Sequence, residues 1–171
     1  GEVFSACAAA AVYPRKAFEK VGGFDPDYFA YVEDVDLGFR LRLAGYRCVY
    51  IPEAVVYHVG SGSTGRRSDL AVYYGQRNLV WTFFKDMPGV FVFLFTPLHL
   101  AAIFFLLMTD LVRHQSKIGF KSQFDAMQGL PNLFEKRKSV QSSRKISSLR
   151  IFKFIGANPF LPIMDRIARK F

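Results

Sequence analysis

Residues 31–41 read YVEDVDLGFRL, so three carboxylates, Glu33, Asp34 and Asp36, fall within four positions. The apolar spacing that follows them predicts a helix over residues 33–44. Acids at a helix start have an ordinary explanation, because the positive end of the helix dipole stabilises each of them by about 0.3–1 kcal/mol. That explanation accounts for one or two acids and leaves the residues before them unexplained.

The loop before the acids is rich in aromatic residues: Phe24, Tyr28, Phe29 and Tyr31. Flat amphipathic rings of this kind line pockets for polyhydroxylated ligands. A carboxylate held at a helix start can accept the proton of a hydroxyl while that hydroxyl attacks an electrophile. A substrate-binding loop with a general base is therefore the functional alternative to simple helix capping.

The surrounding segments predict an α/β unit. Residues 3–13 are small and apolar and predict a buried strand, while residues 46–52 and 54–59 predict two short strands. Residues 68–86 have the period of an amphipathic helix that ends before Pro88.

His58 lies at the end of the last predicted strand, and the glycine-rich loop after it leads to Arg66 and Arg67. A lone histidine is more often structural than a ligand. Its setting changes this interpretation, because a metal ligand beside two cations and free backbone N–H groups suits a diphosphate.

Residues 22–63, GGFDPDYFAYVEDVDLGFRLRLAGYRCVYIPEAVVYHVGSGS, resemble the acceptor-side half of the family-two glycosyltransferases with the GT-A fold, particularly the rhamnosyltransferase-like and galactofuranosyltransferase-like members. The shared parts are the GGFD turn, the acidic ED at a helix start, the G-Y-x-x-x-Y-x-P strand and the His before a Gly/Ser loop. Residues 73–81, YYGQRNLVW, are similar to the RN-containing helix that follows. The resemblance covers about residues 4–86. It implies an enzyme that transfers a sugar, with inversion, from a nucleotide-diphosphate donor to the hydroxyl of a glycan or lipid-linked acceptor.

The resemblance also implies roles for single residues. Asp34 corresponds to the general base, Glu33 to a residue that positions the acceptor, and His58 to a ligand of a divalent metal, Mg²⁺ or Mn²⁺, that bridges the donor phosphates. Asp36 is expected either to hydrogen-bond within the site or to pair with Arg40 four residues on, and the spacing favours the pair.

Four further residues are candidates for substrate binding: Tyr31, Arg66, Arg67 and Arg77. For Arg77 the alternatives are a contact with the donor phosphates or the acceptor, and a structural salt bridge. The family's nucleotide-binding half and its DxD motif lie N-terminal to the matched region, and the DPD of residues 25–27 falls in the acceptor loop instead. The expected fold is therefore the C-terminal half of a Rossmann-like GT-A domain, inactive as this fragment.

The net charge of +9 is unevenly distributed. Residues 1–89 hold ten acids and ten bases, whereas residues 90–171 hold four acids and thirteen bases. Residues 90–108 form an apolar run that is broken by Pro97 near its centre, which predicts a kinked or interfacial membrane segment; a buried core helix is the alternative. Bases after an apolar helix fit the cytoplasmic face of the cell membrane, so a membrane surface rather than nucleic acid is the expected partner.

The predicted organisation is an acceptor-side unit over residues 1–88 and a helical, membrane-associated region over residues 89–171, with a basic solvated linker at 136–148. The two cysteines, Cys7 and Cys48, have no metal-ligand spacing and are expected to be reduced core thiols of a cytosolic protein. A non-catalytic, basic membrane-binding module remains the alternative function.

Overall fold

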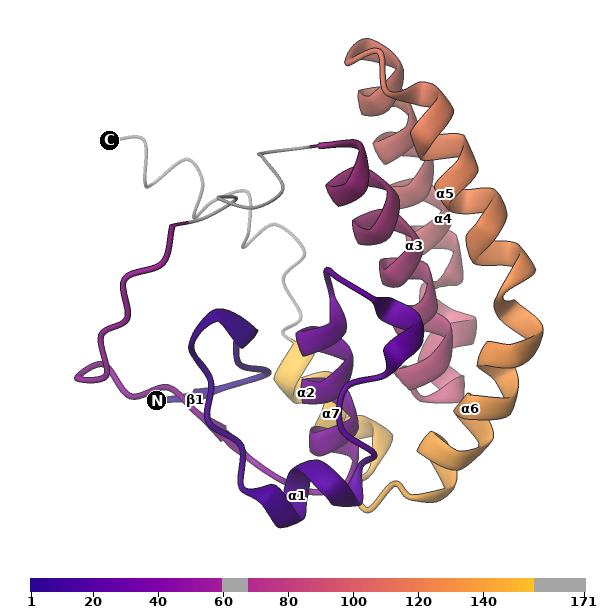
Figure 1. The fold of residues 1–171 in the computed structure, drawn as a ribbon. Coiled ribbons are helices and arrows are strands. Elements are labelled where there is room, and N and C mark those ends of the chain that lie inside the picture. The colour runs from indigo at the N-terminus through magenta and orange to yellow at the C-terminus, as the bar shows by residue number, and fades with distance from the viewer. Residues whose placement is uncertain (60–67, 156–171) are drawn as a thin grey trace.

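The computed structural model describes residues 1–59 and 68–155 and is mainly helical there (Figure 1). In chain order the elements are β1 (Glu2–Val3), η1 (Ala8–Ala10), α1 (Arg15–Lys20), η2 (Pro26–Tyr28), α2 (Glu33–Leu43), β2 (Cys48–Val49), α3 (Asp69–Asp86), α4 (Gly89–Val112), α5 (Ser116–Gln128), α6 (Leu130–Ser142) and α7 (Ser148–Ile155). Strands β1 and β2 pair antiparallel, with Glu2 opposite Val49. Within the described residues no parallel Rossmann-like sheet is formed.

The two helices that carry the predicted motifs are confirmed. Helix α2 begins at Glu33, and Gly45 follows its end with a φ of +90°, a conformation that glycine adopts readily. Helix α3 begins after Ser68, whose Oγ accepts a hydrogen bond of 3.2 Å from the backbone N–H of Ala71.

The predicted strands are mostly wrong. Only Glu2–Val3 and Cys48–Val49 pair as strands, residues 8–10 form a 3₁₀ turn, and residues 54–59 have no regular structure and are exposed. A β-branched sequence becomes a strand only when a neighbouring strand accepts its hydrogen bonds, and the described part of the chain offers residues 54–59 no such neighbour.

One core joins the two predicted regions. It consists of Tyr28, Val80, Trp81, Ala126 and Leu133. These residues come from η2, α3, α5 and α6, and helices α5 and α6 run along α3 (Figure 1). The core therefore crosses the predicted boundary at residue 88, which itself remains a prediction.

A second apolar cluster closes the C-terminal end of α2. Phe39 and Leu43 of α2 pack on Ile151 of α7. The predicted linker over residues 136–148 is wrong in its first half, because residues 136–142 belong to α6. Its cations are not simply solvated: Lys136, for example, pairs with two aspartates of the first half.

Helix α4 is long and apolar enough to cross a membrane, by length and composition. Only 6% of its most apolar stretch is buried in the chain, so the alternative of a buried core helix is not what the structure shows. Its side chains Phe93, Phe104 and Phe105 are all exposed. Pro97 lies inside the helix.

The cysteines are free thiols, but Cys7 is exposed and Cys48 is half-buried. The expectation that Cys7 lies in a core is therefore wrong, because the apolar run around it forms no buried strand.

Candidate functional site

The acid loop, residues 28–34, joins η2 to helix α2 and carries Glu33 and Asp34 at its end. Its backbone is unusual, because Phe29, Tyr31 and Val32 all have positive φ, of 60°, 64° and 69°. Residues other than glycine in such conformations cost about 1–3 kcal/mol each and persist only where surrounding contacts impose them. The loop is therefore held in place by its neighbours.

Asp34 is half-buried at the start of α2, and backbone N–H groups hold both of its oxygens. Its Oδ2 accepts a hydrogen bond of 2.9 Å from Ala8, and its Oδ1 accepts one of 2.8 Å from Val35. Ala8 belongs to the turn η1, so the small N-terminal residues orient this carboxylate. An oriented, half-buried carboxylate is what a general base requires.

Glu33 lies beside it in a different environment. Burial raises the pKa of Glu33, its own backbone N–H lowers the pKa, and the negative charge of Asp34 raises it again, for a net value above the ordinary one. Its Oε2 is buried and has no hydrogen-bond partner in the described part of the chain. Glu33 is therefore a half-buried acid with one buried oxygen that the described residues leave without a donor.

Asp36 is fully buried and pairs with Arg40, as the helical spacing favoured. Arg40 Nε donates to Asp36 Oδ2 at 3.0 Å, and Lys85 Nζ forms an ion pair with Asp36 Oδ1. Burial leaves Asp36 no surface for a substrate. Its role is to tie α2 to α3.

The GGFD turn is fixed by the same lysine and by α6. Lys85 Nζ lies 2.7 Å from Asp25 Oδ2, and Lys136 Nζ lies 2.6 Å both from Asp25 Oδ1 and from Asp27 Oδ2. Burial alone would raise the pKa of Asp25, but the hydrogen bonds from the two lysines outweigh it and lower the pKa to about 2. The two aspartates of the DPD sequence thus form ion pairs with lysines of this chain.

The predicted aromatic pocket is only partly formed. Tyr28 is fully buried, and its hydroxyl lies 3.1 Å from the Thr82 hydroxyl, so it belongs to the core. Phe29 is 72% exposed and packs against Tyr74, and Tyr31 is half-buried in the acid loop. The rings of Phe29 and Tyr31 thus lie outside the core, in the loop that leads to the acids.

Arg77 contacts the loop rather than a carboxylate. Its Nη2 donates to the backbone carbonyl of Asp27 at 2.7 Å, and its guanidinium lies 4.1 Å from the centre of the Trp81 ring. The described residues give it no salt bridge. The sequence did not predict a role for its neighbour Asn78, which contacts the same loop. The only indication was that Asn78 belongs to the RN pair.

The described residues do not form a metal site around His58. His58 is exposed on the irregular segment after β2. In the described ranges, 1–59 and 68–155, no three His, Cys, Asp or Glu side chains converge to hold an ion. Arg66 and Arg67 lie outside the described residues. The residues present do not fit a metal by themselves.

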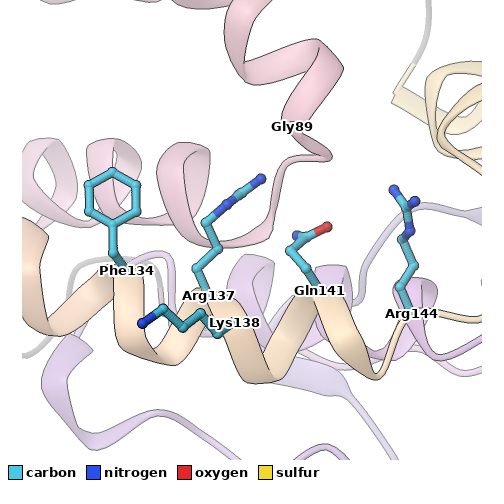
Figure 2. A pocket seen from close by; sticks show the side chains of 6 residues that line it. All are labelled: Gly89, Phe134, Arg137, Lys138, Gln141 and Arg144. Carbon is cyan, nitrogen blue, oxygen red and sulfur yellow. The ribbon is translucent and has the colours of Figure 1, made fainter.

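Two hollows lie away from Asp34. The larger, of about 430 Å³, lies between α6 and the start of α4, where the side chains of Arg137, Gln141 and Arg144 extend from α6 on the side of Gly89 (Figure 2). The smaller, of about 260 Å³, lies over the lysine and aspartate contacts of the GGFD turn.

The chain matches the family described as glycosyl transferase family group 2 over residues 1–112. Over 62 residues it is 55% identical to the N-acetylglucosaminyl-diphospho-decaprenol L-rhamnosyltransferase of Mycobacterium tuberculosis (strain ATCC 25618 / H37Rv). This matched segment covers 35% of this chain and 20% of that relative. Over 41 residues it is 51% identical to rhamnosyltransferase WbbL of Escherichia coli (strain K12). That segment covers 24% of this chain and 16% of the relative. The matched segments thus span a fifth or less of these relatives. No solved structure gives a significant match.

Proposed function

This chain belongs to glycosyl transferase family group 2, and from that premise we propose that it is the acceptor-side part of an inverting glycosyltransferase with the GT-A fold. The enzyme transfers a sugar, rhamnose by analogy with the names of its relatives, from a nucleotide-diphosphate donor. The nucleotide-binding half belongs to the rest of the protein.

The observation that carries this proposal is the geometry of Asp34. Its carboxylate is held by two backbone N–H groups and half-exposed at the start of α2, inside the region that matches the family. In the proposed step the acceptor oxygen attacks the anomeric carbon and the bond from that carbon to the diphosphate breaks. The acceptor proton passes to Asp34, and the diphosphate leaves with the bonding electrons.

Glu33 and Tyr31 are proposed to bind the acceptor. The carboxyl group of Glu33, half-buried beside Asp34, accepts a hydrogen bond from a second acceptor hydroxyl, which orients the sugar ring. Tyr31 and the exposed ring of Phe29 provide apolar faces beside it.

Donor-side residues remain predictions. Arg66 and Arg67 are proposed to meet the donor diphosphate, and His58 to contribute one ligand to a divalent cation whose other ligands lie elsewhere in the protein. Arg77, in contrast, uses its guanidinium within the chain.

The acceptor is proposed to be lipid-linked, with the enzyme at the cytoplasmic face of the membrane. The exposed apolar side chains of α4 support this, as does the name of one relative, which specifies N-acetylglucosaminyl-diphospho-decaprenol. The hollow beside Gly89, at the start of the same helix, is lined by Arg144 and by Arg137, whose Nη1 also donates to the carbonyls of Phe84 and Met87 (Figure 2). Cations in that position are suited to lipid phosphates.

The decisive experiment replaces Asp34→Asn in the full-length protein. Removing a general base is expected to lower kcat by about 10²–10⁴-fold, while vesicle binding stays unchanged. Sugar transfer to a lipid-linked acceptor is the readout, and Glu53→Gln, an exposed acid outside the acid loop, is the matched control.

The competing function is a non-catalytic membrane-binding module. It predicts that the full-length protein transfers no sugar before any substitution, yet still binds vesicles. Full transfer activity in D34N would instead exclude Asp34 as the base while leaving the family assignment intact.

A further inference from the structure

Asn78, on α3, is fully buried and reaches the acid loop from behind. Its Nδ2 lies 2.9 Å from the carbonyl oxygen of Tyr28, 2.9 Å from that of Ala30 and 2.7 Å from that of Tyr31. Because an amide has two N–H protons, at least one of them is shared between carbonyls. A single side chain thus satisfies three acceptors in four consecutive residues.

The backbone of the loop explains why this contact is needed. The positive φ values at Phe29 and Tyr31 turn the carbonyls on either side of them toward α3. The Tyr28 carbonyl also accepts a hydrogen bond of 2.7 Å from the backbone N–H of Ala30, and the amide of Asn78 ties this carbonyl to those of Ala30 and Tyr31. Without the amide, the carbonyls of Ala30 and Tyr31 would lose this donor and their tie to Tyr28, and a loop built from non-glycine residues would relax toward ordinary φ.

The orientation of the amide is itself fixed. Asn78 Oδ1 accepts a hydrogen bond of 3.0 Å from Arg77 Nε, and the Arg77 guanidinium lies against the Trp81 ring. This contact directs the Nδ2 side of the amide toward the carbonyls, because a flipped amide would face them with oxygen.

We propose that Asn78 is a positioning residue for catalysis: it locks the acid loop so that Glu33 and Asp34 meet the acceptor in a fixed geometry. It touches neither substrate nor reacting atoms and acts through Asp34. The inference rests on the proposed function, because it assumes that Asp34 takes the acceptor proton.

The test compares two buried amides of the same helix in the full-length transferase. Asn78→Ala removes the contact with the acid loop, whereas Gln76→Ala removes a buried amide that bonds Asp110 of α4 and does not touch the loop. A displacement of the base by about 1 Å is expected to lower kcat about 10²-fold in N78A, with the donor KM unchanged. Q76A is expected to keep its kcat despite a comparable loss of melting temperature.

A second variant covers the case in which N78A does not fold. Asn78→Ser keeps one hydroxyl donor and is expected to give a kcat between those of N78A and the unchanged enzyme. Hydrogen exchange at residues 29–34 should be faster in both Asn78 variants and unchanged in Q76A. Unchanged exchange there would overturn the proposal.

A double substitution separates positioning from general support. If Asn78 acts through Asp34, N78A in the D34N background costs no more than about a twofold further loss of the residual rate. A further loss as large as in the unchanged enzyme would show a structural role and overturn the inference, while the D34N result alone tests the proposed function.

Discussion

Asp86, the last residue of α3, is a fully buried carboxyl group at the negative end of a helix. Neither of its oxygens has a hydrogen-bond partner within the described residues. Burial raises the pKa of Asp86 well above its ordinary value, and the negative charge of Asp36 raises it further. The folded protein therefore retains a proton that the unfolded chain releases, and this lowers stability as pH rises from the unfolded pKa toward the folded one.

We expect Asp86→Asn to stabilise the protein at neutral pH. The amide has no charge to bury, so the variant's advantage is absent below about pH 4 and grows by at most about 1.4 kcal/mol per pH unit above it. Melting temperatures of the full-length protein between pH 3 and pH 8 give the comparison.

Asp125→Asn is the control of opposite sign. Hydrogen bonds from Lys121 and Tyr73 lower the pKa of Asp125, so its contribution is present above the unfolded pKa and is lost as pH falls. D125N should therefore be slightly less stable at neutral pH. If the melting temperature of D86N never exceeds that of the unchanged protein, Asp86 is not a buried acid whose raised pKa lowers stability.

At the scale of elements, α4 and α5 approach each other closely where α5 carries Gly119. A Cβ atom at Gly119 would lie 2.4 Å from Asp110 Oδ2 and 3.3 Å from the Leu107 side chain. Asp110 cannot simply move away, because it is buried and accepts a hydrogen bond of 2.5 Å from Gln76. One missing side chain therefore allows α3, α4 and α5 to meet.

Gly119→Ala is expected to destabilise the protein by about 1–3 kcal/mol, although alanine is the better helix former. Gly75→Ala is the matched control, because a Cβ at Gly75 in α3 meets nothing within 4 Å. It should gain about 0.5–1 kcal/mol from helix propensity alone. Chemical denaturation of both variants measures the difference, and a stabilised G119A would show that α4 and α5 are loosely packed.

The apolar surface of α4 and the positive charge of the second half are both features that favour contact with an anionic membrane. The chain carries a net charge of +9, and the exposed side chains of α4 include three phenylalanines, Phe93, Phe104 and Phe105. Apolar insertion and attraction to anionic lipid add to one another in membrane binding.

We expect the triple substitution of these phenylalanines by serine to reduce binding to phosphatidylglycerol vesicles strongly, at low and at high salt. Unchanged protein should lose only part of its binding when salt is raised, because salt screens the charges and spares the apolar contact. Vesicle co-sedimentation of the full-length protein tests both, with D34N as the variant that keeps its affinity. Full binding by the triple variant would exclude α4 as the contact.

The sequence predicted those parts of the fold whose signals are local. The helix at Glu33 and the helix after Ser68 have clear periods and ends, and Asp36 and Arg40 pair because a helix places them one turn apart. Of the two strands predicted after Gly45, only Cys48–Val49 pairs, because strand pairing depends on neighbours distant in the sequence. The anchoring of Asp25 by Lys136 could not be predicted, since 111 residues separate them and nothing in either segment signals the other.

The ion pairs between α6 and the first half of the chain have a practical consequence for expression. A recombinant protein that ends at residue 112, where the family match ends, would lack Lys136, which pairs with both Asp25 and Asp27, and would expose Trp81. A C-terminal boundary chosen by homology alone would thus yield a poorly soluble, aggregation-prone protein. A boundary that retains α7 is the better choice for crystallisation or assay.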